Sequence, residues 1–410
     1  MQRWLKFVKY LPACGWTPVV VCPEGAHYPA LDTSLEDEVA SDVEMLRLPI
    51  FEPQAYLDRL GSKSGGMPQG ASAGGERTSK LRRAMSWIRG NVFIPDARAL
   101  WVGPAAKGVK RYLREHPVDA IVSTGPPHSV HLIALRVKQA FPEVPWLADF
   151  RDPWSDMDYL DDFQLTAWSR KRHRTLEQRV VAACDELVIT APSAAQSLLR
   201  RSLAAGEKGA WVPNGYDEAD GFNAVQPDEE GPLVLGFFGS LYGSRNAPGL
   251  WRAVRRWNDA GDGRPIRLDF YGSVSPEVEA SLQEALPAGG WELRGNIPHE
   301  EVPDAMARCH GLVLIQNNNR TGMRTIPGKV FEYLATQRPL IVGGALDSDL
   351  QRLVNGWGLK MSAMEDVDGF YEQLAAAARN TLPQVDPTEY RRDRLTQRMA
   401  LLLDQITTTK

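Results

Sequence analysis

The sequence predicts an α/β protein with two parallel sheets and crossover helices, on three observations. Its 410 residues exceed what one hydrophobic core usually supports, so two domains are expected. Apolar runs typical of buried strands alternate with amphipathic stretches typical of helices through both halves of the chain. In the second half the alternation is regular, with apolar runs near 233–239, 266–271, 311–315 and 339–342, each followed by a helical pattern.

The first half shows the same alternation less evenly. Trp4, Phe7 and Leu11 recur at helical spacing and predict an opening helix. Residues 61–80 are rich in Gly and Ser with few large apolar groups, so we expect them to be disordered. The remaining expected elements are strands at 17–22, 119–124 and 146–150, helices at 102–115 and from His128, a further alternation through 184–213, and a terminal helix at 390–403.

A polar loop at 316–325 leads into a segment with paired charges. The run Ile326-Pro-Gly-Lys-Val-Phe-Glu-Tyr-Leu-Ala335 predicts a helix that carries Lys329 and Glu332 in its first turn. Residues three apart share one helix face, and free amides at the helix start favour an anion beside them. This arrangement suits a nucleoside diphosphate, with the lysine on phosphate and the glutamate on ribose hydroxyls. The alternative is an ordinary surface ion pair between the two side chains.

A second loop with phosphate-binding chemistry follows the first apolar run of this half. The stretch Leu235-Gly-Phe-Phe-Gly-Ser-Leu-Tyr-Gly-Ser-Arg-Asn246 places glycines at 239 and 243, which allow close backbone approach. It also places Arg245 ahead of a helix, where a guanidinium can hold phosphate oxygens in a fork. Two such loops in one predicted domain indicate one ligand held between them.

These two stretches resemble the carboxyl-terminal half of a family-4 glycosyltransferase of the GT-B fold, a retaining enzyme that uses nucleotide sugars. The resemblance extends over nearly the whole chain. Trp211-Val-Pro-Asn-Gly-Tyr-Asp217 is similar to the family's interdomain segment. In the first half, Ser123-Thr-Gly-Pro-Pro-His-Ser129 and Ala148-Asp-Phe-Arg-Asp-Pro-Trp154 resemble motifs of its exopolysaccharide and lipopolysaccharide branch.

The resemblance implies two doubly wound Rossmann-like domains that face a cleft. The acceptor-side domain is expected at 1–214, the nucleotide-sugar domain at 215–386, and a C-terminal segment at 387–410 whose helix packs back on the first domain. Members of the family begin with a strand and a glycine-rich loop ahead of the helix that starts here at Gln2. The chain therefore starts inside the expected first domain, which leaves an unpaired position at the centre or edge of its sheet.

The resemblance also assigns roles to the residues of the two loops. Arg245 and Lys329 would bind the diphosphate and act in catalysis, Gly239 and Ser240 would belong to the same donor site, and Glu332 would bind the ribose. Many members carry another glutamate eight positions before this one. Here that position is Arg324, so the chain departs from the family pattern at the contact with the donor sugar.

Four polar residues follow predicted strands in the first half: His128, Asp149, Arg151 and Asp152. We expect them on the acceptor or donor-sugar side, and we favour Asp152 as the functional carboxylate. The alternatives are a helix-start histidine bonded to backbone at 128 and a structural ion pair of Arg151 with the neighbouring aspartates. Trp154 fits either an aromatic rim for a sugar or simple packing.

The implied reaction moves a sugar from a nucleotide diphosphate sugar to a saccharide or polyprenyl-linked acceptor with retention, in cell-surface polysaccharide synthesis. Cations stabilise the departing diphosphate in this reaction, so Arg245 and Lys329 would replace a metal, and no cofactor is expected. Asp347-Ser-Asp349 has the spacing of a metal-binding motif, but we expect it to cap a helix.

The composition indicates which kinds of partner and which cellular compartment to expect. A net charge of −4 with both signs dispersed gives no reason to expect nucleic acid. Four separated cysteines without a ligand pattern favour a reducing cytoplasm, and no apolar run reaches the length of a membrane span. Two basic clusters, at 80–89 and 170–174, are explained either by solvated helix faces, the commoner case, or by peripheral contact with the inner face of an anionic membrane.

Three alternatives to an active transferase stay open. A catalytically impaired paralogue would bind the donor without transferring it, and a nucleotide-sugar epimerase would need further acid and base groups that the sequence does not reveal. A truncated enzyme is the third, because the expected first strand precedes Met1; we prefer a misassigned start codon. The donor sugar, the nucleotide base, the acceptor and the oligomeric state are not encoded in spacing.

Overall fold

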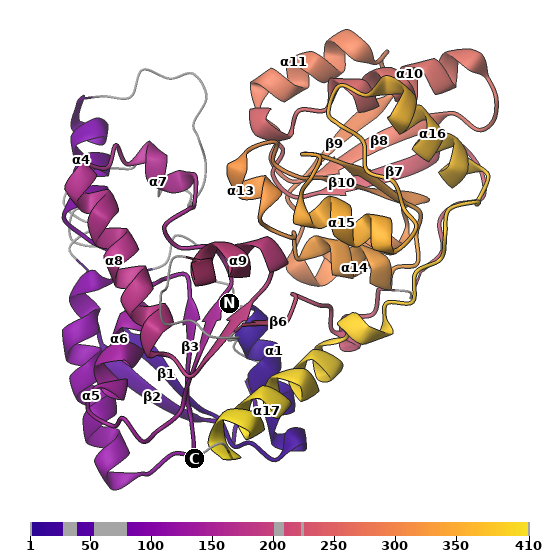
Figure 1. The fold of residues 1–410 in the computed structure, drawn as a ribbon. Helices are drawn as coiled ribbons and strands as arrows, with labels where there is room; N and C mark the ends of the chain where they lie inside the picture. Colours follow the sequence, from indigo (N-terminus) through magenta and orange to yellow (C-terminus); the bar gives the residue numbers. More distant parts are fainter. Residues whose placement is uncertain (1, 28–38, 53–79, 201–208, 223–224, 409–410) are drawn as a thin grey trace. The chain divides into compact units, whose positions relative to one another are not determined.

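A computed structural model describes residues 2–27, 39–52, 80–200, 209–222 and 225–408, which form two compact units (Figure 1). Unit 1 comprises residues 1–212 and 395–410, and unit 2 comprises residues 213–394. The change of unit at Pro213 lies close to the boundary expected after residue 214. The segment expected to be disordered, 61–80, lies outside the described residues except for Lys80.

Unit 2 is built on a five-stranded parallel sheet in the order β11-β10-β7-β8-β9. The chain lays down β7, β8 and β9 in one direction and then returns to the other side of β7 for β10 and β11. The topological switch point therefore lies between β7 and β10. The strands are β7 (Leu233–Phe238), β8 (Ile266–Tyr271), β9 (Trp291–Gly295), β10 (Gly311–Ile315) and β11 (Leu340–Gly343).

Helices alternate with these strands, as the sequence predicts for a doubly wound sheet. They are α10 (Pro248–Ala260), α11 (Pro276–Ala285), α12 (Val302–Ala307), α13 (Arg320–Met323), α14 (Lys329–Ala335), α15 (Asp349–Gly356) and α16 (Val367–Ala378).

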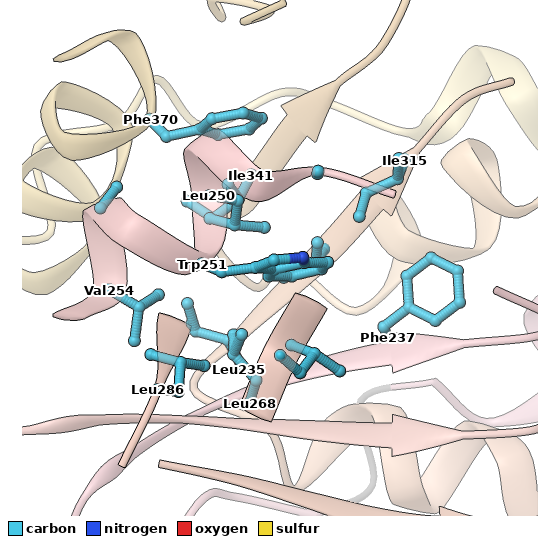
Figure 2. Packing of buried hydrophobic residues seen from close by; sticks show 14 of the residues in the cluster. Leu235, Phe237, Leu250, Trp251, Val254, Leu268, Leu286, Ile315, Ile341 and Phe370 are labelled. Atoms are coloured by element: carbon cyan, nitrogen blue, oxygen red, sulfur yellow. The ribbon is translucent and has the colours of Figure 1, made fainter. Parts of the chain in front are cut away.

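The hydrophobic core of unit 2 forms where α10 lies on the sheet. Trp251 of α10 is fully buried and lies among Leu235 of β7 and Leu268 of β8 (Figure 2). Its ring meets Phe270 edge to face with centroids 5.9 Å apart, and its indole N–H donates to Asn246 Oδ1 at 3.0 Å. The core thus fixes α10, and with it the loop between β7 and α10, to the sheet.

Unit 1 contains two separate parallel sheets among its described residues, with the orders β1-β2 and β3-β4-β5-β6. The strands are β1 (Val19–Glu24), β2 (Glu44–Pro49), β3 (Ile121–Gly125), β4 (Trp146–Phe150), β5 (Glu186–Ile189) and β6 (Ala210–Trp211). The helices are α1 (Gln2–Tyr10), α4 (Lys80–Asn91), α5 (Val102–Glu115), α6 (Ser129–Lys138), α7 (Tyr159–Asp162), α8 (Ala167–Ala183), α9 (Pro192–Arg200) and α17 (Arg392–Thr408).

Each of the two sheets of unit 1 has two edge strands in the described chain. β1 pairs with β2 alone, and β3 pairs with β4 alone. Both strands are apolar but only partly buried, and Val21 of β1 is exposed, whereas every residue of β4 is buried. β1 and β3 are thus edge strands of their sheets in the described chain, and the unpaired position expected from the sequence stays a prediction.

The first and last helices of the chain share one core in unit 1. Phe7 and Leu11 at the start of the chain pack with Leu395, Met399 and Leu403 of α17 and with buried residues of β4 and β5. The indole N–H of Trp16 also donates to Asp404 Oδ1 at 3.0 Å. The C-terminal helix is thus part of unit 1 although the chain has passed through unit 2 before reaching it.

Two strands of the structure are missing from the sequence-based expectation. β2 has the sequence Glu-Met-Leu-Arg-Leu-Pro and β9 has Trp-Glu-Leu-Arg-Gly, and both are sheet-edge strands with mostly exposed or half-buried residues. Their polar residues break the continuous apolar run that identified the buried strands.

No helix among the described residues is long and apolar enough to cross a membrane.

The packing of Trp251 predicts a large effect on the stability of unit 2. Trp251→Ala should lower the free energy of unfolding by about 3–5 kcal/mol, because it leaves a cavity between α10 and the sheet. Hydrogen exchange of peptides from β7 and β8 under native conditions reports this loss. Trp168→Ala, at an exposed tryptophan, serves as the control and should change the free energy of unfolding by about 0.5 kcal/mol or less. Equal exchange in both variants would contradict the packing described above.

Candidate functional site

One residue at the end of β7, Phe238, anchors the helix that carries the paired charges. The Lys329 ammonium donates to the Phe238 carbonyl at 2.6 Å, and the Phe238 N–H donates to the hydroxyl oxygen of Tyr333 at 3.1 Å. Lys329 and Tyr333 are one turn apart in α14 and share a face. The carboxyl end of β7 therefore holds the start of α14 at two points.

Gly239 makes this close approach possible. It follows Phe238 with a φ of +121°, which favours glycine, and a side chain there would collide with the Lys329 ammonium. The neighbouring Gly272, with a φ of +131°, packs in the same way against the backbone of Gly239. The sequence predicts close backbone approach at Gly239, and in the structure the Lys329 ammonium is the group beside it.

Arg245 ties the loop after β7 to the loop after β10. Its Nη1 donates to the Ser240 carbonyl at 2.9 Å, and its Nε donates to Asn317 Oδ1 at 2.7 Å. The backbone N–H of Asn318 donates to the Ser244 carbonyl at 3.0 Å and closes the same contact. Since β7 and β10 flank the switch point of the sheet, both predicted phosphate loops lie where ligands bind in open α/β sheets.

Both cations have N–H groups that make no hydrogen bond to the described residues. Among the described residues Lys329 uses one of its three N–H groups, and Arg245 uses two of its five. Both side chains are half-buried and hold their charges next to backbone carbonyls rather than carboxylates. An anion with several oxygens, such as a diphosphate, could accept the remaining donors and would neutralise the local positive charge.

Lys329 and Glu332 do not form the surface ion pair that was the alternative interpretation. The lysine bonds to Phe238, and the Glu332 carboxylate makes no hydrogen bond or ion pair to the part of the chain that the structure describes. Burial raises the pKa of Glu332, opposed by Lys329, Arg392 and His299. Burial likewise lowers the pKa of Lys329, opposed by Glu332. Both groups are thus partly desolvated and available to a ligand.

Asp149 lies in a hydrogen-bond network inside unit 1. Its oxygens accept from the Arg3 guanidinium at 3.2 and 3.3 Å, from the Trp4 indole at 2.6 Å and from the Thr124 hydroxyl at 2.9 Å. The carboxylate is fully buried. The ion pair considered in the sequence analysis was with Arg151, but the observed partner is Arg3, which joins β4 to α1. These contacts give Asp149 a structural role, and its expected place on the acceptor or donor-sugar side stays a prediction.

His128 belongs to a buried stack of rings. It lies parallel to the Trp154 indole with centroids 4.9 Å apart, and His131 stacks on Phe150 at 4.3 Å. Neither ring nitrogen of His128 has a hydrogen-bond partner among the described residues, and burial holds its pKa well below the usual range. Trp154 is fully buried and donates to His173 Nδ1 at 3.1 Å, so it packs in the core and forms no exposed rim.

Arg151 and Asp152 lie directly after β4. The Arg151 guanidinium donates to the carbonyls of Gly125 and Pro126, and its own carbonyl accepts from the Thr190 hydroxyl at 2.5 Å. Arg151 therefore holds the ends of β3, β4 and β5 together. Asp152 is half-buried and makes no hydrogen bond to the described residues, and burial raises its pKa against the influence of Arg151. Of these four residues, Asp152 is the carboxylate left for a ligand.

Sequence reasoning missed several residues that position these groups. Tyr333 lies four residues after Lys329, so its shared helix face was a usable signal. Asn317 lies in the polar run Gln316-Asn-Asn-Asn319, but nothing in that run marks the one side chain that meets Arg245. Arg3 gave no signal, because 146 positions separate it from Asp149.

The Asp347-Ser-Asp349 motif caps a helix, as expected. Ser348 is the N-cap of α15, and its hydroxyl accepts from the Gln351 N–H at 3.1 Å. Among the residues that the structure describes, no group of three or more His, Cys, Asp or Glu side chains is placed to hold a metal ion.

Comparison with solved structures identifies the architecture. A sucrose-phosphate synthase from Thermosynechococcus elongatus matches with a TM-score of 0.61 and 13% identity, covering 99% of this chain and 92% of that one. HepE from Anabaena, in complex with UDP and glucose, matches with a TM-score of 0.59 and 12% identity, covering 98% and 95%. The chain has the GT-B fold. The lipopolysaccharide outer core galactosyltransferase WaaB also matches, with a TM-score of 0.52 and 10% identity over 91% and 87%.

No protein-family model matches this GT-B chain, and no curated protein sequence matches it. The structural likeness extends over both units, because more than nine-tenths of the chain is covered in all three comparisons. At identities of 10–13% this likeness establishes the fold, and the assignment of side chains rests on the geometry above.

The contact between Gly239 and Lys329 predicts a specific defect in anion binding. Gly239→Ala should displace the ammonium and strongly weaken affinity for pyrophosphate, measured by calorimetry, and should also strain the backbone by about 1–3 kcal/mol. Gly261→Ala is the matched control, since Gly261 also has a positive φ but open space around it. The control should lose stability and keep its affinity. Equal pyrophosphate affinity in the two variants would rule out the contact.

The raised pKa of Glu332 predicts a pH dependence of stability. As the pH rises above 4.5, the ordinary pKa of a glutamate, the unfolded chain releases the Glu332 proton while the folded protein still holds it. The free energy of unfolding therefore falls as the pH rises from 4.5 towards the raised pKa of the folded protein. Glu332→Gln should remove this decline and be more stable than the wild type at neutral pH. Thermal denaturation at a series of pH values from acidic to neutral measures the decline in stability, with Glu284→Gln, at an exposed glutamate, as the control. A variant curve parallel to the wild-type curve would contradict the desolvation of Glu332.

Proposed function

We propose that this protein is a glycosyltransferase that takes its sugar from a nucleotide diphosphate sugar. The observation that carries the proposal is the arrangement of Lys329 and Arg245 on the two carbonyls that flank Gly239, at the switch point of the unit 2 sheet. Two cations held there without carboxylate partners are suited to a diphosphate. The GT-B fold, shared with structures named as sugar-transferring enzymes, supports the same chemistry.

In this proposal the unit 2 site binds the donor and stabilises the leaving group. Lys329 and Arg245 bind the diphosphate oxygens, with Gly239 and Ser240 giving them close backbone access. As the bond to the sugar breaks, negative charge grows on the diphosphate, and fixed cations in a partly desolvated site stabilise it. Glu332, on the same helix turn as Lys329, accepts the ribose hydroxyls. The transfer proceeds with retention and needs no metal.

The acceptor is proposed to be a saccharide or a polyprenyl-linked saccharide, bound from unit 1. Asp152 orients the attacking hydroxyl, and Arg151 and His128 shape the site around it by holding the segment after β3. Two similar structures support this proposal: HepE is solved with UDP-glucose, a nucleotide-sugar donor, and WaaB is a lipopolysaccharide outer core galactosyltransferase. The proposed setting is cell-surface polysaccharide synthesis at the cytoplasmic face of the membrane.

Donor turnover tests the function directly. The full chain is incubated with UDP-, GDP- and ADP-sugars, with and without a lipid-linked saccharide acceptor, and the nucleotide products are separated by chromatography. A transferase releases nucleoside diphosphate from one donor class, faster with the acceptor. Isomerised nucleotide sugar would instead identify an epimerase.

A catalytically impaired, donor-binding protein is the second candidate, and one observation favours it. Among the described residues, unit 1 forms two separate sheets of two and four strands, whereas unit 2 forms one continuous sheet of five. Binding of a nucleotide sugar without nucleotide release, for every acceptor tried, would decide for this candidate.

The assignment of Asp152 predicts a defect in turnover alone. Asp152→Asn should lower the transfer rate by roughly 10²–10⁴-fold, the range for a lost acid–base group, while donor affinity stays within about twofold. Asp119→Asn is the matched control, because that exposed aspartate precedes β3 rather than following a strand. Steady-state rates and donor titrations of both variants measure the effect. A wild-type rate in Asp152→Asn would remove this residue from the mechanism.

A further inference from the structure

Exposed apolar side chains gather in unit 1 on the helices α4 and α8, which lie near α7 in Figure 1. Trp87 and Ile88 of α4 are 43% and 44% exposed, and Val92, directly after that helix, is 61% exposed. Trp168, in the first turn of α8, is 66% exposed. Tryptophan is rarely this exposed in a soluble domain, because burying its large apolar ring gives a large favourable free energy that an exposed ring does not gain.

These side chains belong to one rigid surface, because Asn91 joins the two helices. Its Oδ1 accepts from the Thr166 N–H and from the Ser169 hydroxyl, both at 2.8 Å, and these residues bracket Trp168. Its Nδ2 donates back to the Trp87 carbonyl at 2.9 Å. The guanidinium of Arg89 lies over the Phe163 ring at 5.4 Å and adds a second link. We call Trp87, Ile88, Val92 and Trp168, with the cations described next, the α4–α8 surface.

Cations outnumber carboxylates in the segments that carry the exposed apolar side chains. Residues 80–92 and 158–174 together contain eight Lys and Arg against three Asp. Arg83 lies one turn before Trp87, and Lys171 and Arg172 lie one turn after Trp168, so exposed cations share a helix face with both tryptophans. Of the three aspartates, Asp161 is paired with Arg170 at 2.8 Å.

Exposed indole rings flanked by cations match the chemistry of an anionic lipid surface. Tryptophan places its apolar ring and polar N–H at the level of lipid headgroups, and Lys and Arg are attracted to anionic headgroups. A protein partner would also use tryptophan and arginine, but an excess of one charge around the apolar centre favours a surface of uniform opposite charge. We propose that the α4–α8 surface binds the headgroup region of an anionic membrane. This contact is independent of the donor site in unit 2.

Vesicle co-sedimentation of the full chain tests the proposal. The probes are vesicles of phosphatidylcholine alone and vesicles that also contain phosphatidylglycerol. We expect sedimentation with the anionic vesicles only, decreasing as salt is raised. The double variant Trp87→Ala/Trp168→Ala should lose about tenfold or more in partitioning, and Lys171→Glu/Arg172→Glu should lose a similar amount.

Matched controls separate the surface from general effects. Leu401→Ala removes an exposed apolar side chain of α17, and Arg252→Glu/Arg255→Glu reverses two exposed cations of α10; both should partition like the wild type. Circular dichroism and pyrophosphate affinity should be unchanged in all variants. Equal sedimentation with neutral and anionic vesicles, or tryptophan variants that partition like the wild type, would overturn the proposal. Self-association abolished by the same variants, without vesicle binding, would assign the surface to a second copy and also overturn it.

Discussion

The candidate donor site depends on the backbone of a single residue, Phe238, at the carboxyl end of β7. The Phe238 carbonyl accepts from Lys329 and its N–H donates to Tyr333, so the strand end and the start of α14 hold one another. Gly239 leaves room for the ammonium beside the Phe238 carbonyl, and the carbonyl of Ser240 accepts from Arg245. Lys329 of α14 and Arg245 of the loop after β7 therefore converge on three consecutive residues. Tyr333 and Trp251 are buried, so the backbone that positions the cations is itself fixed by the core of unit 2.

This arrangement is unfavourable for the empty protein. Burial lowers the pKa of Lys329 and raises that of Glu332, which means that each charge would be better solvated in the unfolded chain. The nearby Arg245 lowers the pKa of Lys329 further. A bound diphosphate would reverse the balance for both cations, since it supplies the negative charge that the described residues do not. Desolvated groups of this kind at a strand end are typical of binding sites rather than of surface ion pairs.

The sequence predicted unit 2 better than unit 1, for physical reasons. Strands buried on both faces, such as Gly311–Ile315, have a continuous apolar sequence that predicts them. The segments after β7 and β10 carry glycines and cations at positions typical of phosphate-binding loops. In unit 1, β2 is a half-polar edge strand, and the partner of Asp149 lies at the other end of the domain sequence. Spacing could not show that Trp154 is buried or that Trp168 is exposed, because both depend on which elements pack together. Spacing also could not show that the helices of the two basic clusters are joined, because Asn91 links them through tertiary hydrogen bonds.

The central claim is that Lys329 and Arg245 bind one diphosphate, and calorimetric titration with UDP and UMP tests it most directly. The wild type and Lys360→Ala, an exposed lysine in the same unit, should bind UDP more tightly than UMP. Lys329→Ala and Arg245→Ala should each weaken UDP binding by about 10–100-fold, equivalent to roughly 1.5–3 kcal/mol for a hydrogen bond to a charged group. Binding of UMP should fall much less. Unchanged UDP affinity in both variants would contradict the claim.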